Sequence, residues 1–193
     1  MTFVLIDYKG GAAFKECVRL PHTVGMVSDL DGHLTQRALA SLAAEIRRRE
    51  RLLLAAGAKD IEDYHRLRDA QTARASRDLL VAGGSSPVTP LRGRGDPLEP
   101  LPRLVLVIDE FAAMVSELPD FMTGLVDIAR RGRSLGIHLI LATQRPAGVV
   151  TPDIQANTSL RIALRVTDST ESADVIGRPD AAHIPKSTPA AAT

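Results

Sequence analysis

Short apolar runs alternate along the chain with longer stretches in which apolar residues recur at helical spacing. Segments of strand length, most of them apolar throughout, predict five β-strands: 3–7, 22–28, 104–108, 137–142 and 160–166. Helical periodicity predicts four helices: 31–56, 60–75, 118–135 and 169–175. Between the second helix and the third strand, a segment rich in Gly, Pro and Ser predicts a flexible loop at residues 83–102.

The order of these elements predicts the fold class. Apolar strands that alternate with helices are typical of a mostly parallel sheet sandwiched by helices, so we expect an α/β fold. Parallel strands end at a common edge of the sheet, and ligands bind beyond that edge. Three of the predicted strands end there in polar residues: Asp7 and Lys9, Asp109 and Glu110, and Thr143 and Gln144. The sequence therefore predicts a functional site at this edge.

Composition narrows the possible functions. The 193 residues carry a formal net charge of +1 and only 3% aromatic residues. Total charge therefore does not indicate a dedicated nucleic-acid-binding domain, and recognition by stacked aromatic side chains is not expected. The single cysteine, Cys17, excludes a disulfide scaffold and a cysteine-based zinc site. No apolar run approaches the roughly 18 residues that a membrane helix needs, so we expect a cytoplasmic location, with any membrane attachment through other parts of a larger assembly.

The strongest chemical signal follows the third predicted strand. Leu104 to Ile108 are all apolar, and Asp109 and Glu110 come directly after them, which is the Walker B pattern. In this pattern a buried strand fixes the Asp carboxylate where it can hold the Mg²⁺ of a bound nucleotide, usually through water, and we expect this role for Asp109. We expect the Glu110 carboxylate to orient and activate the attacking water. The alternative is a core strand that simply ends in acidic residues.

Gln144 adds to this signal because it follows the next predicted strand, in the run LILATQRP. If the two strands are neighbours in a parallel sheet, its amide lies near Glu110 and is placed to sense the γ-phosphate of ATP or to position water. The alternative is a polar loop residue that caps the next segment.

Five segments carry a family resemblance: DYKGG, EIRRRERLL, LVLVIDEFA, RRGRSLGIHLILATQRP and ANTSLRIALRV. In this order they resemble the FtsK/SpoIIIE family of motor ATPases, and most closely its type VII secretion (EccC-like) branch. The resemblance implies a RecA-like P-loop NTPase core over residues 1–189, with 190–193 as a tail. It also implies ATP and Mg²⁺ as cofactors, and a hexameric ring or a chain of tandem ATPase modules.

The resemblance further implies a trans-acting arginine and a polymer substrate. Arg49 aligns best with an arginine that acts across a subunit interface, and Arg48 aligns second. Such a guanidinium neutralises charge on the transferring phosphoryl group. The alternative is a solvated helix face, since runs of arginine are usually exposed. The polymer is protein, as in type VII secretion, or double-stranded DNA, and the EccC-like segments favour protein.

One expected motif does not occur in the sequence. A P-loop needs GxxxxGK[ST], and no Gly-Lys-Ser or Gly-Lys-Thr is present. In the family, the strand and helix that carry this Walker A motif precede the segment that resembles the start of this sequence. We therefore expect a core that is incomplete on its N-terminal side, with unpaired sheet edges and little ATP hydrolysis by the chain alone. Two further interpretations stay open: a degenerate, non-catalytic module that docks onto intact ATPase partners, and a truncated gene product.

Overall fold

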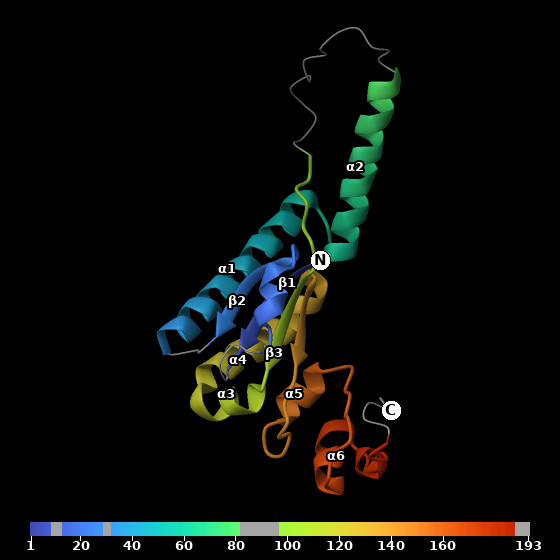
Figure 1. Ribbon diagram of the computed structural model, residues 1–193. Helices are drawn as coiled ribbons and strands as arrows, with labels where there is room; N and C mark the ends of the chain where they lie inside the picture. Colours follow the sequence, from blue (N-terminus) through green and yellow to red (C-terminus); the bar gives the residue numbers. More distant parts are fainter. Residues whose placement is uncertain (9–12, 29–31, 82–96, 188–193) are drawn as a thin grey trace.

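The computed structural model describes residues 1–8, 13–28, 32–81 and 97–187 (Figure 1). Within these residues four strands form one sheet: β1 (Thr2–Asp7), β2 (Thr23–Ser28), β3 (Leu104–Asp109) and β4 (Ile137–Leu141). Their spatial order is β2-β1-β3-β4, and each pair of neighbours is parallel. The predicted α/β fold with a parallel sheet is therefore confirmed.

The described helices extend the predicted set. They are α1 (Gly32–Ala56), α2 (Ile61–Val81), α3 (Phe111–Glu117), α4 (Pro119–Leu135), α5 (Pro152–Asn157) and α6 (Ser169–Ile176), with short 3-10 helices at Lys15–Arg19 and Asp180–His183. Four of them match predicted helices, although α2 continues six residues beyond its predicted end at residue 75. The sequence pattern missed α3 and α5, which are too short to show a helical period.

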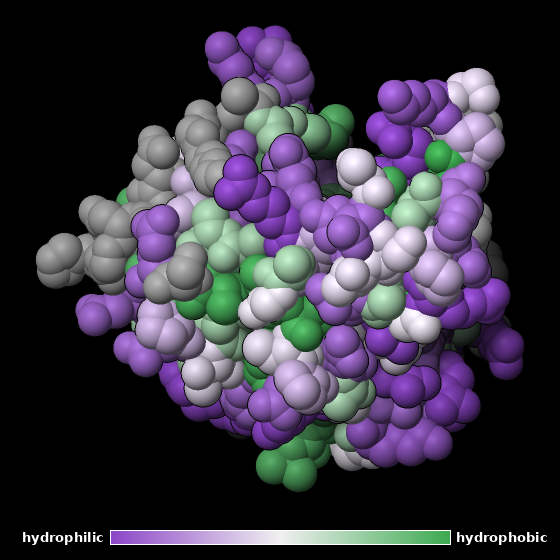
Figure 2. Space-filling view, turned by 90° about the horizontal axis from the view of Figure 1, so that it is seen from below, coloured by the Kyte–Doolittle hydropathy of each residue, from purple (hydrophilic) through white to green (hydrophobic). Residues whose placement is uncertain are grey.

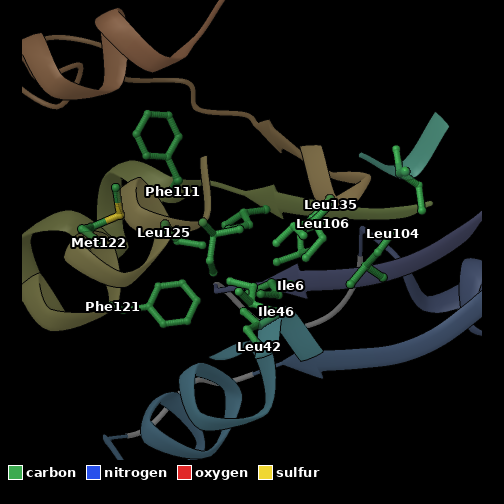
Figure 3. Close-up of a cluster of buried hydrophobic side chains, with 14 of the residues drawn as sticks. Ile6, Leu42, Ile46, Leu104, Leu106, Phe111, Phe121, Met122, Leu125 and Leu135 are labelled. Atoms are coloured by element: carbon green, nitrogen blue, oxygen red, sulfur yellow. The ribbon is translucent and has the colours of Figure 1, made fainter. Parts of the chain in front are cut away.

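The core lies between one face of the sheet and helices α1 and α4 (Figure 3). Ile6 and Leu106 from the central strands pack with Ile46 of α1 and with Phe121 and Leu125 of α4, and all five are at most 2% exposed. Burial of each such side chain stabilises the fold by about 2 kcal/mol. This packing holds β1 and β3 side by side, so that their carboxyl ends reach the same rim.

The predicted strand at 160–166 is wrong, because this segment forms no strand in the structure. Its alternating apolar side chains are exposed: Leu160 by 76%, Ile162 by 54% and Leu164 by 54%. Alternation reports that a segment suits a sheet, but a strand also needs a neighbour that accepts its hydrogen bonds. No strand among the described residues pairs with it, and β4, where Ile140 is 52% exposed, is an edge strand of the described sheet.

Some sequence predictions fall on residues that the structure does not describe. Lys9, the tail at 190–193 and most of the predicted loop at 83–102 lie outside the described residues. The described end of that loop, residues 97–102, has no regular secondary structure. Across the described ranges, no helix is both long enough and apolar enough to cross a bilayer.

Candidate functional site

The carboxyl end of β3 turns into α3 at the acidic pair. Glu110 has φ 51° and ψ 45°, and among the described residues it is the only non-glycine residue with positive φ. This left-handed conformation costs an L-residue about 1–2 kcal/mol. The backbone N–H of Glu110 donates a hydrogen bond of 3.0 Å to Oδ1 of Asp109. The turn therefore ties the two acidic residues together where the strand ends.

The Glu110 carboxylate contacts the segment that follows β4. Thr143 Oγ1 donates to Oε1 of Glu110 at 3.4 Å, and the backbone N–H of Gln144 donates to Oε2 at 3.4 Å. The ladder between the two strands continues to this point, since the N–H of Ala142 donates to the carbonyl of Ile108 at 2.9 Å. Glu110 is 9% exposed, so the two weak hydrogen bonds hold a nearly buried carboxylate. The structure thus brings Glu110 and Gln144 together at the rim.

The side chain of Gln144 is exposed, and its backbone amide makes the contact with Glu110. Thr143, which the sequence pattern marked only as a polar strand end, contributes the second contact. The sequence did indicate this contact, because Thr143 carries a hydroxyl and directly precedes Gln144. Figure 2, which views the molecule from the lower end of Figure 1, shows apolar and hydrophilic residues intermixed on this face.

Asp7 brings a third carboxylate to the same rim. It pairs in register with Asp109 across the parallel β1–β3 ladder, where adjacent strands lie about 4.8 Å apart. Asp7 is 5% exposed, and the backbone N–H of Ala13 donates to its Oδ2 at 3.2 Å. The next residue, Tyr8, donates its hydroxyl hydrogen bond to Glu117 of α3, and this bond raises the pKa of Tyr8. Side-chain bonds thus tie the end of β1 to the elements around the acidic pair.

The donor set at the rim fits a Mg²⁺ ion that is shared with a nucleotide. Mg²⁺ is usually bound through one or two carboxylates, several waters and the phosphates of a substrate. Asp109 is partly exposed, and its Oδ2 accepts no hydrogen bond from the described residues. The described residues also contain no cluster of three or more His, Cys, Asp or Glu side chains that could hold a metal by themselves. Asp109 is therefore suited to hold Mg²⁺ through water while phosphate oxygens supply other ligands.

Arg49 does not join this site. It is 2% exposed, and its Nε donates to Glu45 at 2.8 Å. Its Nη1 donates to the carbonyl of Leu135 at 2.8 Å and to that of Gly136 at 3.4 Å, and its Nη2 donates to the carbonyl of Pro102 at 2.8 Å. These carbonyls precede β3 and β4, at the opposite edge of the sheet from Glu110. The guanidinium therefore fastens α1 to the amino ends of two strands.

This placement does not support the expected trans-acting role of Arg49. A guanidinium that acts on a neighbouring subunit has to reach the surface, whereas the donors of Arg49 are used inside the fold. Arg48, which aligned second, is partly exposed and pairs with Glu99 at 2.7 Å and Glu45 at 3.4 Å. In the described chain the guanidinium of Arg49 is therefore engaged within the fold rather than presented at the surface.

The parallel sheet and the acidic rim define an α/β domain of the kind that nucleotide-hydrolysing motors use. The sequence matches the FtsK/SpoIIIE family over residues 1–148, and the chain belongs to this family. This identification agrees with the resemblance carried by the strand-end motifs.

Sequence relatives point to one branch of the family. The chain is 42% identical over 184 residues to the type VII secretion system protein EssC of Staphylococcus aureus. It is 38% identical over 185 residues to the ESX secretion system protein YukB of Bacillus subtilis. Each alignment covers 95% of this chain and 11% of the relative, so the chain spans about a tenth of the length of either protein.

Solved structures support the same fold. The cytoplasmic domain of the type VII secretion ATPase EccC from Thermomonospora curvata superposes with a TM-score of 0.70 and 34% identity, covering 96% of this chain and 19% of that one. The pCW3 conjugation coupling protein TcpA superposes with a TM-score of 0.67 and 24% identity, covering 96% of this chain and 46% of that one. The second likeness concerns the fold alone.

Proposed function

We propose that this chain supplies the hydrolytic rim of an ATP-driven motor domain. In this proposal Asp109 holds the Mg²⁺ of a bound nucleotide through water, Glu110 activates the attacking water, and Gln144 responds to the γ-phosphate. The observation that carries the proposal is the pair of hydrogen bonds that hold Glu110 beside Thr143 and Gln144. A core strand that merely ended in acidic residues would not need these contacts.

Each residue has a definite task in this chemistry. Mg²⁺, when bound with ATP, neutralises charge on the phosphate oxygens. The Glu110 carboxylate accepts a proton from water as the water oxygen attacks the γ-phosphorus, and the bond from that phosphorus to the leaving oxygen of ADP breaks. Thr143 and the Gln144 amide keep the carboxylate oriented towards the rim. The exposed Gln144 side chain is free to turn towards a phosphate.

The phosphates themselves need further donors. A GxxxxGK[ST] loop contributes most contacts to bound phosphates, and the 193 residues contain no such motif. We propose that polypeptide outside these residues supplies the loop and pairs with the exposed edge of β4. The position of β4 supports this, because in the described sheet β4 pairs with β3 on one side and with no strand on the other.

The proposed substrate of the assembled motor is an exported protein. EssC and YukB, the relatives at 42% and 38% identity, are named as secretion proteins. A structure of Thermomonospora curvata EccC holds a signal sequence peptide, although at 21% identity it shares only the fold with this chain. We also propose a cytoplasmic location, since the relative at 34% identity is a cytoplasmic domain.

ATP turnover in the presence of a segment that carries the phosphate-binding loop tests this function. The chain alone is expected to hydrolyse little ATP, and addition of a strand–GxxxxGK[ST]–helix polypeptide should produce Mg²⁺-dependent hydrolysis. Glu110→Gln should then reduce turnover by about 10²–10⁴-fold while fluorescent nucleotide still binds. Glu16→Gln makes the same chemical change on an exposed 3-10 helix and should leave turnover unchanged. Equal turnover by the Glu110→Gln variant would overturn the assignment.

A further inference from the structure

The distal half of α2 lies outside the body of the fold. Residues 69–77, more than two helical turns, are all exposed, and Figure 1 shows this part of the helix extending away from the sheet. Short helices are marginal in water, and most of their stability comes from packing against a neighbour. The backbone N–H of Leu98 donates to Oε1 of Gln71 at 3.0 Å, but residues 69–77 are all exposed, so this part of α2 offers a surface for contact with another molecule.

Two arginines on this segment have no charged partner in the described part of the chain. Arg74 and Arg77 lie three residues apart, so they share one face of α2 and are separated by about 4.5 Å along the helix axis. Ala70 and Ala73 lie beside them on the same face, and their small side chains allow another surface to approach closely. This face is positively charged and sterically open.

Helix α6 carries the complementary charge with the same spacing. Glu171 and Asp174 also lie three residues apart and are partly exposed, and neither carboxylate forms an ion pair with a described residue. Asp168, at the start of the helix, extends the acidic row by three more residues. Figure 1 shows α2 and α6 at opposite ends of the molecule, so the two charged rows cannot meet within one chain.

We propose that the distal part of α2 docks onto α6 of a second copy of this chain, with Arg74 and Arg77 facing Glu171 and Asp174. Because the two surfaces differ, the contact is head-to-tail and can repeat from copy to copy into a ring or a filament. A protein partner is favoured over nucleic acid because the chain itself carries the matching acidic row and has a net charge of only +1. The inference extends the proposed motor function by naming its subunit contact, but its test needs no nucleotide.

Two charge-reversed variants test the contact. One variant carries Arg74→Glu with Arg77→Glu, and the other carries Glu171→Arg with Asp174→Arg. All four side chains are at least partly exposed, so both variants are expected to keep the far-UV circular dichroism of the wild type. Two differently tagged copies of each protein are co-expressed, aggregates are removed by centrifugation, and recovery of one tag with the other is measured.

The wild-type copies should be recovered together, and each variant alone should show self-association weakened by about tenfold or more. The two variants mixed with each other should regain association, because each reversed surface then meets an opposite charge. High salt should weaken both the wild-type and the mixed association. As a control, Arg47→Glu with Asp120→Arg changes exposed charges on α1 and α4 and should leave recovery unchanged.

Several results would overturn the contact. One is the absence of wild-type self-association. Another is undiminished self-association of both charge-reversed variants when each is tested alone. The third is a lack of association when the two variants are mixed. If the arginine variant instead loses binding to duplex DNA and the mixture does not self-associate, the α2 surface is a nucleic-acid site and the proposed contact is wrong. None of these results depends on ATP turnover, so the contact and the hydrolytic role of Glu110 fail separately.

Discussion

Arg49 lies on the buried face of α1, although it belongs to a run of arginines. Leu42, Ile46 and Leu53 are at most 8% exposed, and Arg49, three residues after Ile46 and four before Leu53, lies on the same face of the helix. The sequence therefore held a signal for burial, which the family resemblance outweighed. Its guanidinium donates to backbone carbonyls that precede two strands and so joins α1 to the sheet.

Replacement of Arg49 by alanine should destabilise the fold by about 3 kcal/mol, because carbonyls that the guanidinium now satisfies would lose their buried donor. Urea unfolding, followed by circular dichroism, measures the loss. Arg47→Ala changes an exposed arginine two positions earlier in the same helix and should alter stability by less than about 0.5 kcal/mol. Similar unfolding midpoints for the two variants would show that the buried contacts of Arg49 contribute little.

The left-handed backbone of Glu110 is strained, and this strain predicts which replacement at position 110 gives the more stable fold. Because its φ is 51°, glycine at this position should be more stable than alanine by about 1 kcal/mol. The matched control is Ala112→Gly within α3, where glycine should destabilise by about 0.5–1 kcal/mol. Urea unfolding of the three variants checks the order. A Glu110→Ala variant as stable as Glu110→Gly would show that the left-handed conformation is not strained.

At the level of helices and strands, the four strands of the sheet could be predicted because each is a short, largely apolar segment of strand length. The rim could be predicted from these strands, because the carboxyl ends of parallel strands meet at one edge. Asp109 ends β3, Glu110 comes next, and Gln144 lies three residues beyond the end of β4. The segment at 160–166 shows what a local sequence pattern does not predict. Its alternation is correct for a strand, but pairing depends on a neighbour that a local pattern does not reveal.

Helix α6 depends on a carboxylate cap at its first turn. Oδ1 of Asp168 accepts the backbone N–H of Thr170 at 2.6 Å, and this backbone hydrogen bond lowers the pKa of Asp168 below its ordinary value of 3.8. A carboxyl whose pKa is lower in the folded state stabilises the fold above its unfolded pKa. This contribution is lost as the pH falls through the folded pKa, so the sign predicts fraying of α6 in acid.

Amide hydrogen exchange at Thr170 and Glu171 measures this fraying. Protection should fall as the pH drops below about 4, after correction for the intrinsic pH dependence of exchange. Asp168→Asn keeps an oxygen acceptor for the cap but cannot ionise, so its protection should depend less on pH. An identical pH profile for the wild type and the asparagine variant would show that the Asp168 charge does not stabilise the helix.

The described part of the molecule buries some of its apolar side chains and leaves others exposed. One face of the sheet is closed by α1 and α4, whereas Ile140 on β4 and the apolar side chains at 160–166 remain exposed. Length, composition and strand patterns gave the α/β class, but the sequence alone did not show that Arg49 is interior or that Thr143 contacts Glu110. Both depend on which elements become neighbours in space. The family membership and the geometry of the rim both support the nucleotide chemistry that we propose for this arrangement.

The central claim is that the rim formed by Asp109, Glu110 and Gln144 holds the metal–nucleotide complex. The most direct measurement is paramagnetic broadening of amide signals by Mn²⁺, bound in place of Mg²⁺ with a non-hydrolysable ATP analogue, after the phosphate-binding segment has been added. Broadening should be strongest at the amides of residues 109–111 and 143–145, and Asp109→Ala should abolish it. Broadening centred at the opposite edge of the sheet, near Gly136, or unchanged broadening in the Asp109→Ala variant would contradict the account.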